Sequence, residues 1–166
     1  MLSKAIAVVT FIFVAPFTLI SAEFKSPEGD VILTINYDGA TGTETIELDL
    51  AGIEDLGLTT IETSTIWTEG VQSFVGIELA TLTRALGIAS GTIRAVALND
   101  YAVEIPVSDA VTGGPILAVM RNAAPMSVRD KGPVWVIYPY DASSDYRTEV
   151  IYSRSIWQLT KLDFQE

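Results

Sequence analysis

The sequence predicts a mixed α+β domain in which short strands outnumber a few short helices. Segments of alternating apolar and polar residues recur along the chain, as in residues 31–37 (VILTINY), and this period of two is typical of half-buried strands. Glycine, asparagine and aspartate separate these segments and favour turns. The helical stretches do not alternate regularly with the strands, which argues against a doubly wound sheet.

About eight strands and two or three short helices are predicted. The predicted strands are residues 31–37, 43–50, 58–66, 92–100, 101–106, 115–120, 134–139 and 153–164. Asp49 is predicted to cap a short helix that ends at Gly57, and leucines at helical spacing predict a helix within residues 77–87. A capped helical turn is expected to begin at Ser108. Residues 67–76 and 141–150 are predicted to be loops.

Residues 1–22 predict a cleavable signal peptide. Lys4 precedes an apolar run over residues 5–20, and Ser21 with Ala22 provides small side chains suited to cleavage after Ala22. A retained membrane anchor is the alternative, but a run of about 16 residues is shorter than the ~20 that a spanning helix needs. We therefore expect residues 23–166 to form one periplasmic or secreted domain without stable membrane insertion.

The charge and the missing residue types exclude several classes of function. The formal charge of the chain is −11, and removal of Lys4 with the signal peptide makes it −12, so binding of nucleic acid is not expected. The sequence contains no cysteine and no histidine. These absences exclude a Ser-His-Asp triad, a Cys-His pair and the usual zinc sites.

Three segments of the sequence are similar to those of a known family. Residues 63–88, 95–110 and 116–139, followed by SRSIWQL at 153–159, resemble the molybdopterin-binding oxidoreductase domain of the sulfite oxidase type. The pairing of NDYAVEIP with RNAAPMSVRDKGPVWVIYP carries the resemblance best. It covers residues ~58 to 164 and implies the fold of that family.

The resemblance also implies a metal ligand that this chain lacks. Redox members of the family bind molybdenum through the pterin dithiolene and one cysteine thiolate, which would fall near Thr63 to Thr65. A protonated hydroxyl does not replace a soft thiolate. We therefore expect the scaffold to be kept, the metal chemistry to be lost and no cofactor to be bound. The alternative is a genuine molybdopterin-dependent oxidoreductase whose metal is held without a protein thiolate.

The candidate ligand-binding residues, for an anion or a pterin, lie in three loops and the closing segment. They are Trp67, Thr68, Glu69, Asn99, Asp100, Tyr101, Arg129, Lys131, Gly132 and Arg154. Catalytic residues are not assigned. The expected function is that of a ligand- or partner-binding module, with a small anionic ligand or an envelope protein as the partner.

Each candidate group also has a plain structural interpretation. Residues 129–132 form either an anion cradle or an exposed turn in which Asp130 neutralises its neighbours. Trp67 either floors a pocket or packs on the core, and residues 99–101 either contact a ligand or form a plain turn. Arg154 lies among several tyrosines that line a groove or are scattered, and it bridges to an acidic neighbour in the simplest case.

Overall fold

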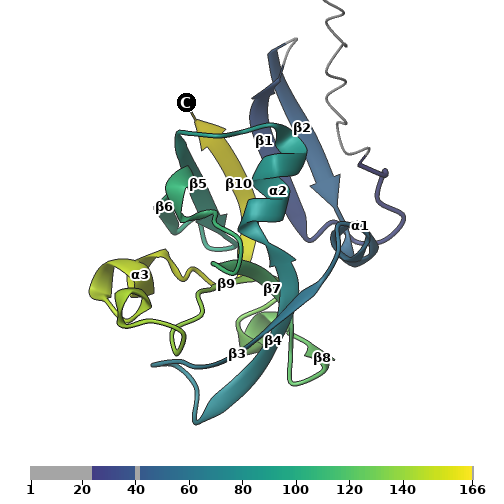
Figure 1. The fold of residues 1–166 in the computed structure, drawn as a ribbon. Helices are drawn as coiled ribbons and strands as arrows, with labels where there is room; N and C mark the ends of the chain where they lie inside the picture. Colours follow the sequence, from purple (N-terminus) through teal and green to yellow (C-terminus); the bar gives the residue numbers. More distant parts are fainter. Residues whose placement is uncertain (1–23, 40–41, 166) are drawn as a thin grey trace, which may run out of the picture.

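The computed structural model describes residues 24–39 and 42–165. The predicted signal peptide and its cleavage site after Ala22 lie outside these residues. Over the described residues the chain forms ten strands, three α-helices and three short 3-10 helices (Figure 1). The mixed α+β class predicted from the sequence is confirmed.

The strands form two sheets. In the first sheet the order is β2 (Gly42–Leu48), β1 (Leu33–Gly39), β10 (Leu159–Gln165), β5 (Thr92–Ala97) and β6 (Ala102–Pro106). In the second sheet the order is β3 (Thr59–Ser64), β4 (Val71–Glu78), β7 (Ile116–Arg121) and β8 (Ala124–Pro125), and β9 (Trp135–Ile137) also pairs with β7.

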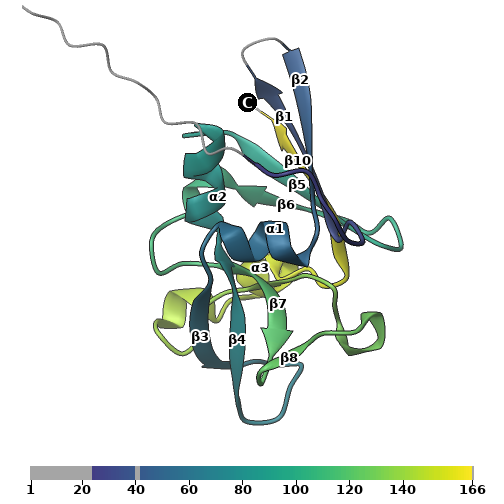
Figure 2. The ribbon, with the colours of Figure 1, turned by 90° about the vertical axis from the view of Figure 1, so that its right-hand side faces the viewer.

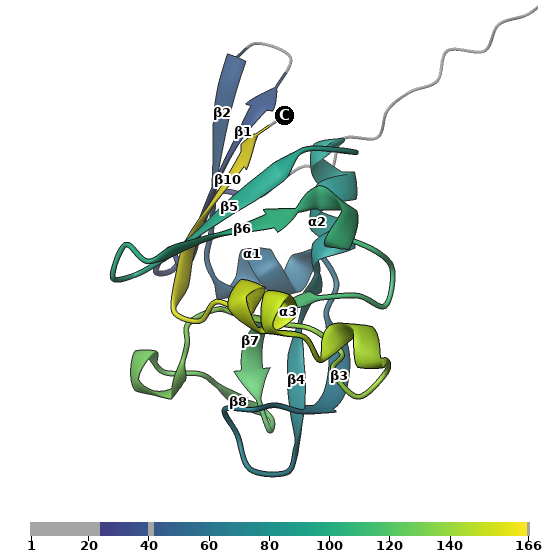
Figure 3. The same ribbon diagram turned by 90° about the vertical axis from the view of Figure 1, so that its left-hand side faces the viewer.

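The helices are short. The α-helices are α1 (Leu50–Asp55), α2 (Leu79–Leu86) and α3 (Glu149–Arg154), and the 3-10 helices are η1 (Val107–Asp109), η2 (Val128–Asp130) and η3 (Ser144–Tyr146). Figures 2 and 3 show the two sheets one above the other, with α1 at the level between them and α2 beside the first sheet. The apolar side chains of both sheets and of the helices form one core.

The first sheet joins the two ends of the described chain. β10 lies parallel to β1 and antiparallel to β5, so the last strand is inserted between early and middle elements of the sequence. Leu33 and Ile35 of β1 are fully buried, while Thr34 and Asn36 are half-buried, which confirms the predicted alternation in this strand. The predicted cap of α1 is also confirmed, because the Asp49 carboxylate accepts a hydrogen bond from the N–H of Gly52 at 2.8 Å.

The predicted loop at residues 67–76 is wrong in its second half, where β4 begins at Val71. β4 pairs with β3 on one side and with β7 on the other, and Phe74 points into the core. A Cβ at Gly76 would overlap the carbonyl oxygen of Leu117. Gly76, the last residue of the predicted loop, therefore marks a close approach of two strands.

Three further boundaries differ from the prediction. The helical turn at Ser108 is a 3-10 turn whose N-cap is Pro106, and no side chain caps it. The predicted loop at residues 141–150 contains η3 and the start of α3, which Thr148 caps through a hydrogen bond from the N–H of Ile151. The last strand was predicted to begin at residue 153, but α3 extends through Arg154 and β10 begins only at Leu159.

The predicted strand at 134–139 contains β9 and lies in the interior. Residues 134–138 have no solvent exposure at all, because β9 pairs with β7 and is covered on both faces. No helix in the described part of the chain is long and apolar enough to cross a membrane.

Candidate functional site

A pocket of about 300 Å³ lies between the β5–β6 turn, the C-terminal end of α3 and the loop that follows β3. We call it the aromatic pocket. Its aromatic lining residues are Trp67, Tyr101, Tyr152 and Trp157, and Asn99 and Gln158 are among its polar lining residues. Among the described residues, no acid, lysine or arginine lines it. A pocket of this size and composition accommodates one flat ring or one large apolar side chain.

Trp67 is the centre of an aromatic cluster that forms the inner wall of the pocket. Its ring centroid lies 5.7 Å from those of Tyr152 and Trp157 and 5.9 Å from that of Trp135, in edge-to-face arrangements. Trp135 and Tyr140 bury the cluster on its inner side. Such pairs contribute about 0.5–1.5 kcal/mol each beyond area burial. Trp67 therefore packs on the core and lines the pocket at the same time.

Ser155 ties the end of α3 to this cluster. Its side chain is buried, donates to the Ile151 carbonyl at 2.8 Å and accepts from the Tyr140 hydroxyl at 2.7 Å. Its carbonyl accepts a hydrogen bond from the indole N–H of Trp135 at 3.1 Å. Burial raises the pKa of Tyr140 to about 12, so this hydroxyl stays protonated at neutral pH. These bonds hold one wall of the pocket in place.

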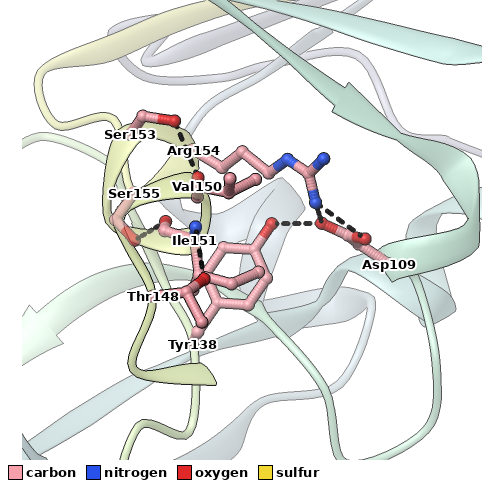
Figure 4. A network of polar contacts seen from close by, with 8 residues as sticks. All are labelled: Asp109, Tyr138, Thr148, Val150, Ile151, Ser153, Arg154 and Ser155. Carbon is pink, nitrogen blue, oxygen red and sulfur yellow. Dashed lines mark hydrogen bonds and ion pairs between the residues drawn. The ribbon is translucent and has the colours of Figure 1, made fainter. Parts of the chain in front are cut away.

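A second polar network fixes α3 from its other side (Figure 4). The guanidinium of Arg154 lies 2.9 Å from the Asp109 carboxylate of η1, and the side chains are 24% and 16% exposed. The Tyr138 hydroxyl donates to the same carboxylate at 2.8 Å. Burial, and then the bond to Asp109, raises the pKa of Tyr138. Arg154 thus bridges to an acidic neighbour and is not among the residues that line the pocket.

The candidate residues 99–101 form the tight turn between β5 and β6. Asp100 has a left-handed backbone with φ of 65°, and the Asn99 side chain accepts from the N–H of Tyr101 at 3.2 Å. Asparagine and aspartate tolerate such turns. Asn99 and Tyr101 nevertheless line the aromatic pocket, so the turn brings two of the candidate residues to the same site as Trp67.

One interpretation of residues 129–132 was an exposed turn in which Asp130 neutralises the neighbouring cations. The ion pairs that it implies are not found in the described part of the chain. Asp130 accepts from the Ser127 hydroxyl at 2.7 Å, and no ion pair to Arg129 or Lys131 is found among the described residues. The Lys131 ammonium lies 4.0 Å from the centroid of the Trp157 ring, a cation–π contact. Burial, and then the nearby Arg121, lowers the pKa of Lys131.

Gly132 has a role in the backbone of the same segment. A Cβ at this position would overlap the carbonyl oxygen of Met126, so the missing side chain lets these two stretches of backbone touch. Arg129 is exposed on η2. Lys131 therefore reaches the wall of the aromatic pocket through Trp157, whereas Arg129 and Gly132 do not line it.

Thr68 and Glu69 lie in the connection between β3 and β4 and do not line the pocket either. The hydroxyl of Thr68 shares a hydrogen bond of 2.7 Å with that of Thr65, and the backbone carbonyl of Glu69 accepts from the side chain of Gln72 at 2.7 Å. The fold thus brings together Trp67, Asn99 and Tyr101, with Lys131 behind Trp157, and leaves the remaining candidate residues outside the pocket.

The sequence analysis missed the pocket residues Ser153, Ser155 and Gln158. It assigned them to a strand, in which alternate side chains would point to opposite faces. Thr148, an N-cap residue three positions before Ile151, was the signal that a helix begins here. Gln158 has a left-handed backbone with φ of 52°, which no sequence pattern indicated.

The residues at the expected position of the metal ligand do not fit a thiolate-bound metal. Thr63 is buried, and its hydroxyl donates to the Ser64 carbonyl and accepts from the N–H of Asp141 at 3.1 Å. The Ser64 hydroxyl donates to Asp141 at 2.7 Å, and Thr65 accepts from the N–H of Trp67 at 3.0 Å. All three hydroxyls are engaged within the protein, and no group of three or more potential metal ligands is found in the described residues.

The two sheets with their few short helices form a mixed α+β fold, the class predicted from the sequence. The chain is similar to the crystal structure of the sulfane dehydrogenase SoxCD from Paracoccus pantotrophus, with a TM-score of 0.52 and 15% sequence identity. The match covers 80% of this chain and 38% of that chain, so this protein spans well under half of its length. No protein-family model and no curated protein matches the sequence. The likeness is therefore one of fold, at a distant level.

Proposed function

We propose that this protein is an exported binding module built on a sulfite oxidase-type scaffold, and that the aromatic pocket is its binding site. The observation that carries the proposal is the composition of the pocket: four aromatic residues and several neutral polar ones surround about 300 Å³. Aromatic walls with a few polar groups are typical of sites that bind a ligand or an anchoring side chain. A small anionic ligand and an envelope protein are the two kinds of occupant to consider.

Intrinsic fluorescence tests the binding site directly. The chain has three tryptophans, and all of them belong to the aromatic cluster. An occupant of the pocket should therefore change the emission of the protein. Tyr101 is 56% exposed and lines the pocket, so Tyr101→Ala should weaken binding without unfolding the chain. Val111→Ala, at an exposed residue that is not in the lining, is the control.

A panel of pterins, sulfur oxyanions and small aromatic carboxylates supplies the ligands for this titration. Saturable quenching that Tyr101→Ala weakens and Val111→Ala leaves unchanged would support the proposal. If neither this panel nor any short peptide changes the emission or the melting temperature, the aromatic pocket is not a binding site.

The proposal includes the loss of redox chemistry. What supports it is the donor set near Thr63, where hydroxyls engaged in protein hydrogen bonds stand in place of the thiolate that the resemblance implies. The competing candidate is a molybdopterin-dependent oxidoreductase whose metal is held without a protein thiolate, the alternative that the sequence resemblance leaves open. Metal analysis of protein purified from its native envelope distinguishes them, because stoichiometric molybdenum with a dithiolene absorption band would overturn the binding module.

Export is tested separately. The proposal expects the protein in the periplasmic or secreted fraction, with a mature chain that starts at Glu23 after cleavage behind Ala22. N-terminal sequencing of the native protein checks both points. A chain that retains residues 1–22, or that remains in the cytoplasm, would contradict the export part of the proposal. The binding site is tested by the titration above and not by this result.

A further inference from the structure

We infer that the aromatic pocket and its exposed rim dock a protein segment that inserts one apolar side chain into the pocket and carries carboxylates beside it. The inference rests on the proposed function, since it names the occupant of that same site. Three observations lead to it: the pocket has an apolar rim, three cations lie on the neighbouring segment, and these cations have no carboxylate partner within the described residues.

Exposed apolar side chains lie at the rim of the pocket and next to it. Leu98 is 58% exposed, Tyr101 56% and Trp157 37%, although all three have large apolar side chains. Backbone bonds hold them together, because the N–H of Leu98 donates to the Gln158 carbonyl at 2.9 Å and that of Ala97 to the Tyr101 carbonyl at 2.8 Å.

The η2 segment extends the rim on one side. The side-chain amide of Gln158 donates to the Val128 carbonyl at 2.7 Å, and Val128 is 45% exposed. The N–H of Gln158 also donates to the Lys131 carbonyl at 3.0 Å. Exposed aromatic and aliphatic residues around one pocket are typical of a surface that another protein covers.

The charge next to the rim is opposite to that of the whole chain. Arg121, Arg129 and Lys131 are three of the ten cations of a chain with a net charge of −11. Lys131 lies on the Trp157 ring, and Arg121 is close enough to lower the pKa of Lys131. The acids nearest to the rim in sequence are Asp100, in the β5–β6 turn, and Asp130, which already accepts a hydrogen bond from Ser127.

These cations are open to a partner's acids. No carboxylate forms an ion pair with Lys131, Arg121 or Arg129 in the part of the chain that the structure describes. Lys131 is half-buried against two indole rings, so part of its hydration is already lost. A carboxylate of the partner would therefore gain a charge-assisted bond at reduced desolvation cost. The net negative charge of the rest of the chain would repel the same partner elsewhere on the surface and so favour this position.

Short synthetic peptides test the inference on the purified protein. Two peptides share a central phenylalanine, which aspartates flank in one and lysines in the other, and binding is followed by tryptophan emission and by calorimetry. The aspartate peptide should bind about tenfold more tightly, a difference that shrinks at high salt, as expected for paired surface charges. Phenylacetamide, which offers the ring without the acids, should bind more weakly than the aspartate peptide.

Variants assign the charge preference to Lys131. Lys131→Met keeps the apolar stem over Trp157 and should remove most of the preference, whereas Lys131→Glu should reverse it. Asp100→Asn, which suits the left-handed turn, should leave the preference in place or strengthen it. Lys25→Met removes a cation that pairs with Asp55 and does not line the pocket, and it should have no effect.

The outcomes separate this inference from the proposed function. If phenylacetamide or a small aromatic carboxylate binds at the pocket as tightly as the aspartate peptide does, the site takes a small molecule and the docking inference is wrong. If the lysine peptide binds equally well, or if Lys131→Met keeps the preference, the charge argument fails. If no probe binds at all, the proposed binding site itself fails.

Discussion

Replacement of Arg154 by methionine should destabilise the fold, because it removes the cation that faces Asp109. The two side chains are 24% and 16% exposed, so their ion pair lies between a surface pair and a buried one. Exposed pairs contribute up to about 1 kcal/mol, whereas breaking a buried pair costs about 3–5 kcal/mol. The bond from Tyr138 to Asp109 remains in the variant and compensates in part. We therefore expect a loss of about 2 kcal/mol in the free energy of unfolding.

Urea and thermal unfolding measure this loss. For a domain of this size, about 2 kcal/mol corresponds to a fall of about 5–8 °C in melting temperature. The matched control is Lys25→Met, because the Lys25–Asp55 pair is exposed at 75% and 53% and its loss should matter little. In a double-mutant cycle, Asp109→Asn combined with Arg154→Met should cost less than the sum of the two single changes. A melting temperature of Arg154→Met equal to that of the control, or strict additivity in the cycle, would refute the reasoning.

Three further predictions concern stability. The N–H groups of Gly52, Gly29 and Glu28 hold the pKa of Asp49 below its usual value. The ionised carboxylate therefore stabilises the fold, and Asp49→Asn removes this stabilisation. It is fully present above about pH 4 and is lost as the pH falls through the lowered pKa. Melting temperatures of the two proteins should therefore converge in acid, and a constant gap would contradict the argument. Tyr140→Phe removes the hydrogen bond to Ser155 and should lower the free energy of unfolding by about 1 kcal/mol at neutral pH. The pKa of Tyr140 is raised to about 12 in the folded protein, so the stability of the native protein should also decline between about pH 10 and that value. The variant lacks the hydroxyl and should not show this decline. Gly132→Ala should lower the free energy of unfolding by about 1–3 kcal/mol through overlap with the Met126 carbonyl, and urea unfolding without any loss would show that the backbone yields there.

The fold class could be predicted because its signals are local. The alternation around Leu33 and Ile35, the cap at Asp49 and the leucine spacing of α2 each depend on residues close together in the sequence. The segment 134–139 was also predicted to contain a strand, and β9 lies within it. In these cases periodicity and capping chemistry act within one element, so no knowledge of its neighbours is needed.

The two main errors have different causes. Gly76 belongs to a strand because β7 approaches its backbone, and nothing local indicates that approach. Here the neighbouring strand overrides the local preference of the chain. The assignment of Ser153 and Ser155 to a strand instead missed a local signal, because Thr148 is a typical N-cap residue and begins a helix there.

The sequence by itself determined the negative charge, the absence of cysteine and histidine, and with them the classes of chemistry that this chain lacks the side chains to perform. It also indicated Trp67, the turn at residues 99–101 and Lys131 as residues of interest, since turns and isolated cations are visible one residue at a time. Only the tertiary structure decided which of them meet, because Trp67 and Trp157 are 90 positions apart in the sequence and become neighbours only when the closing segment packs against the β3–β4 connection. Packing between distant segments is set by the shapes and polar groups of both partners at once, and a pattern read along one segment contains only half of that information.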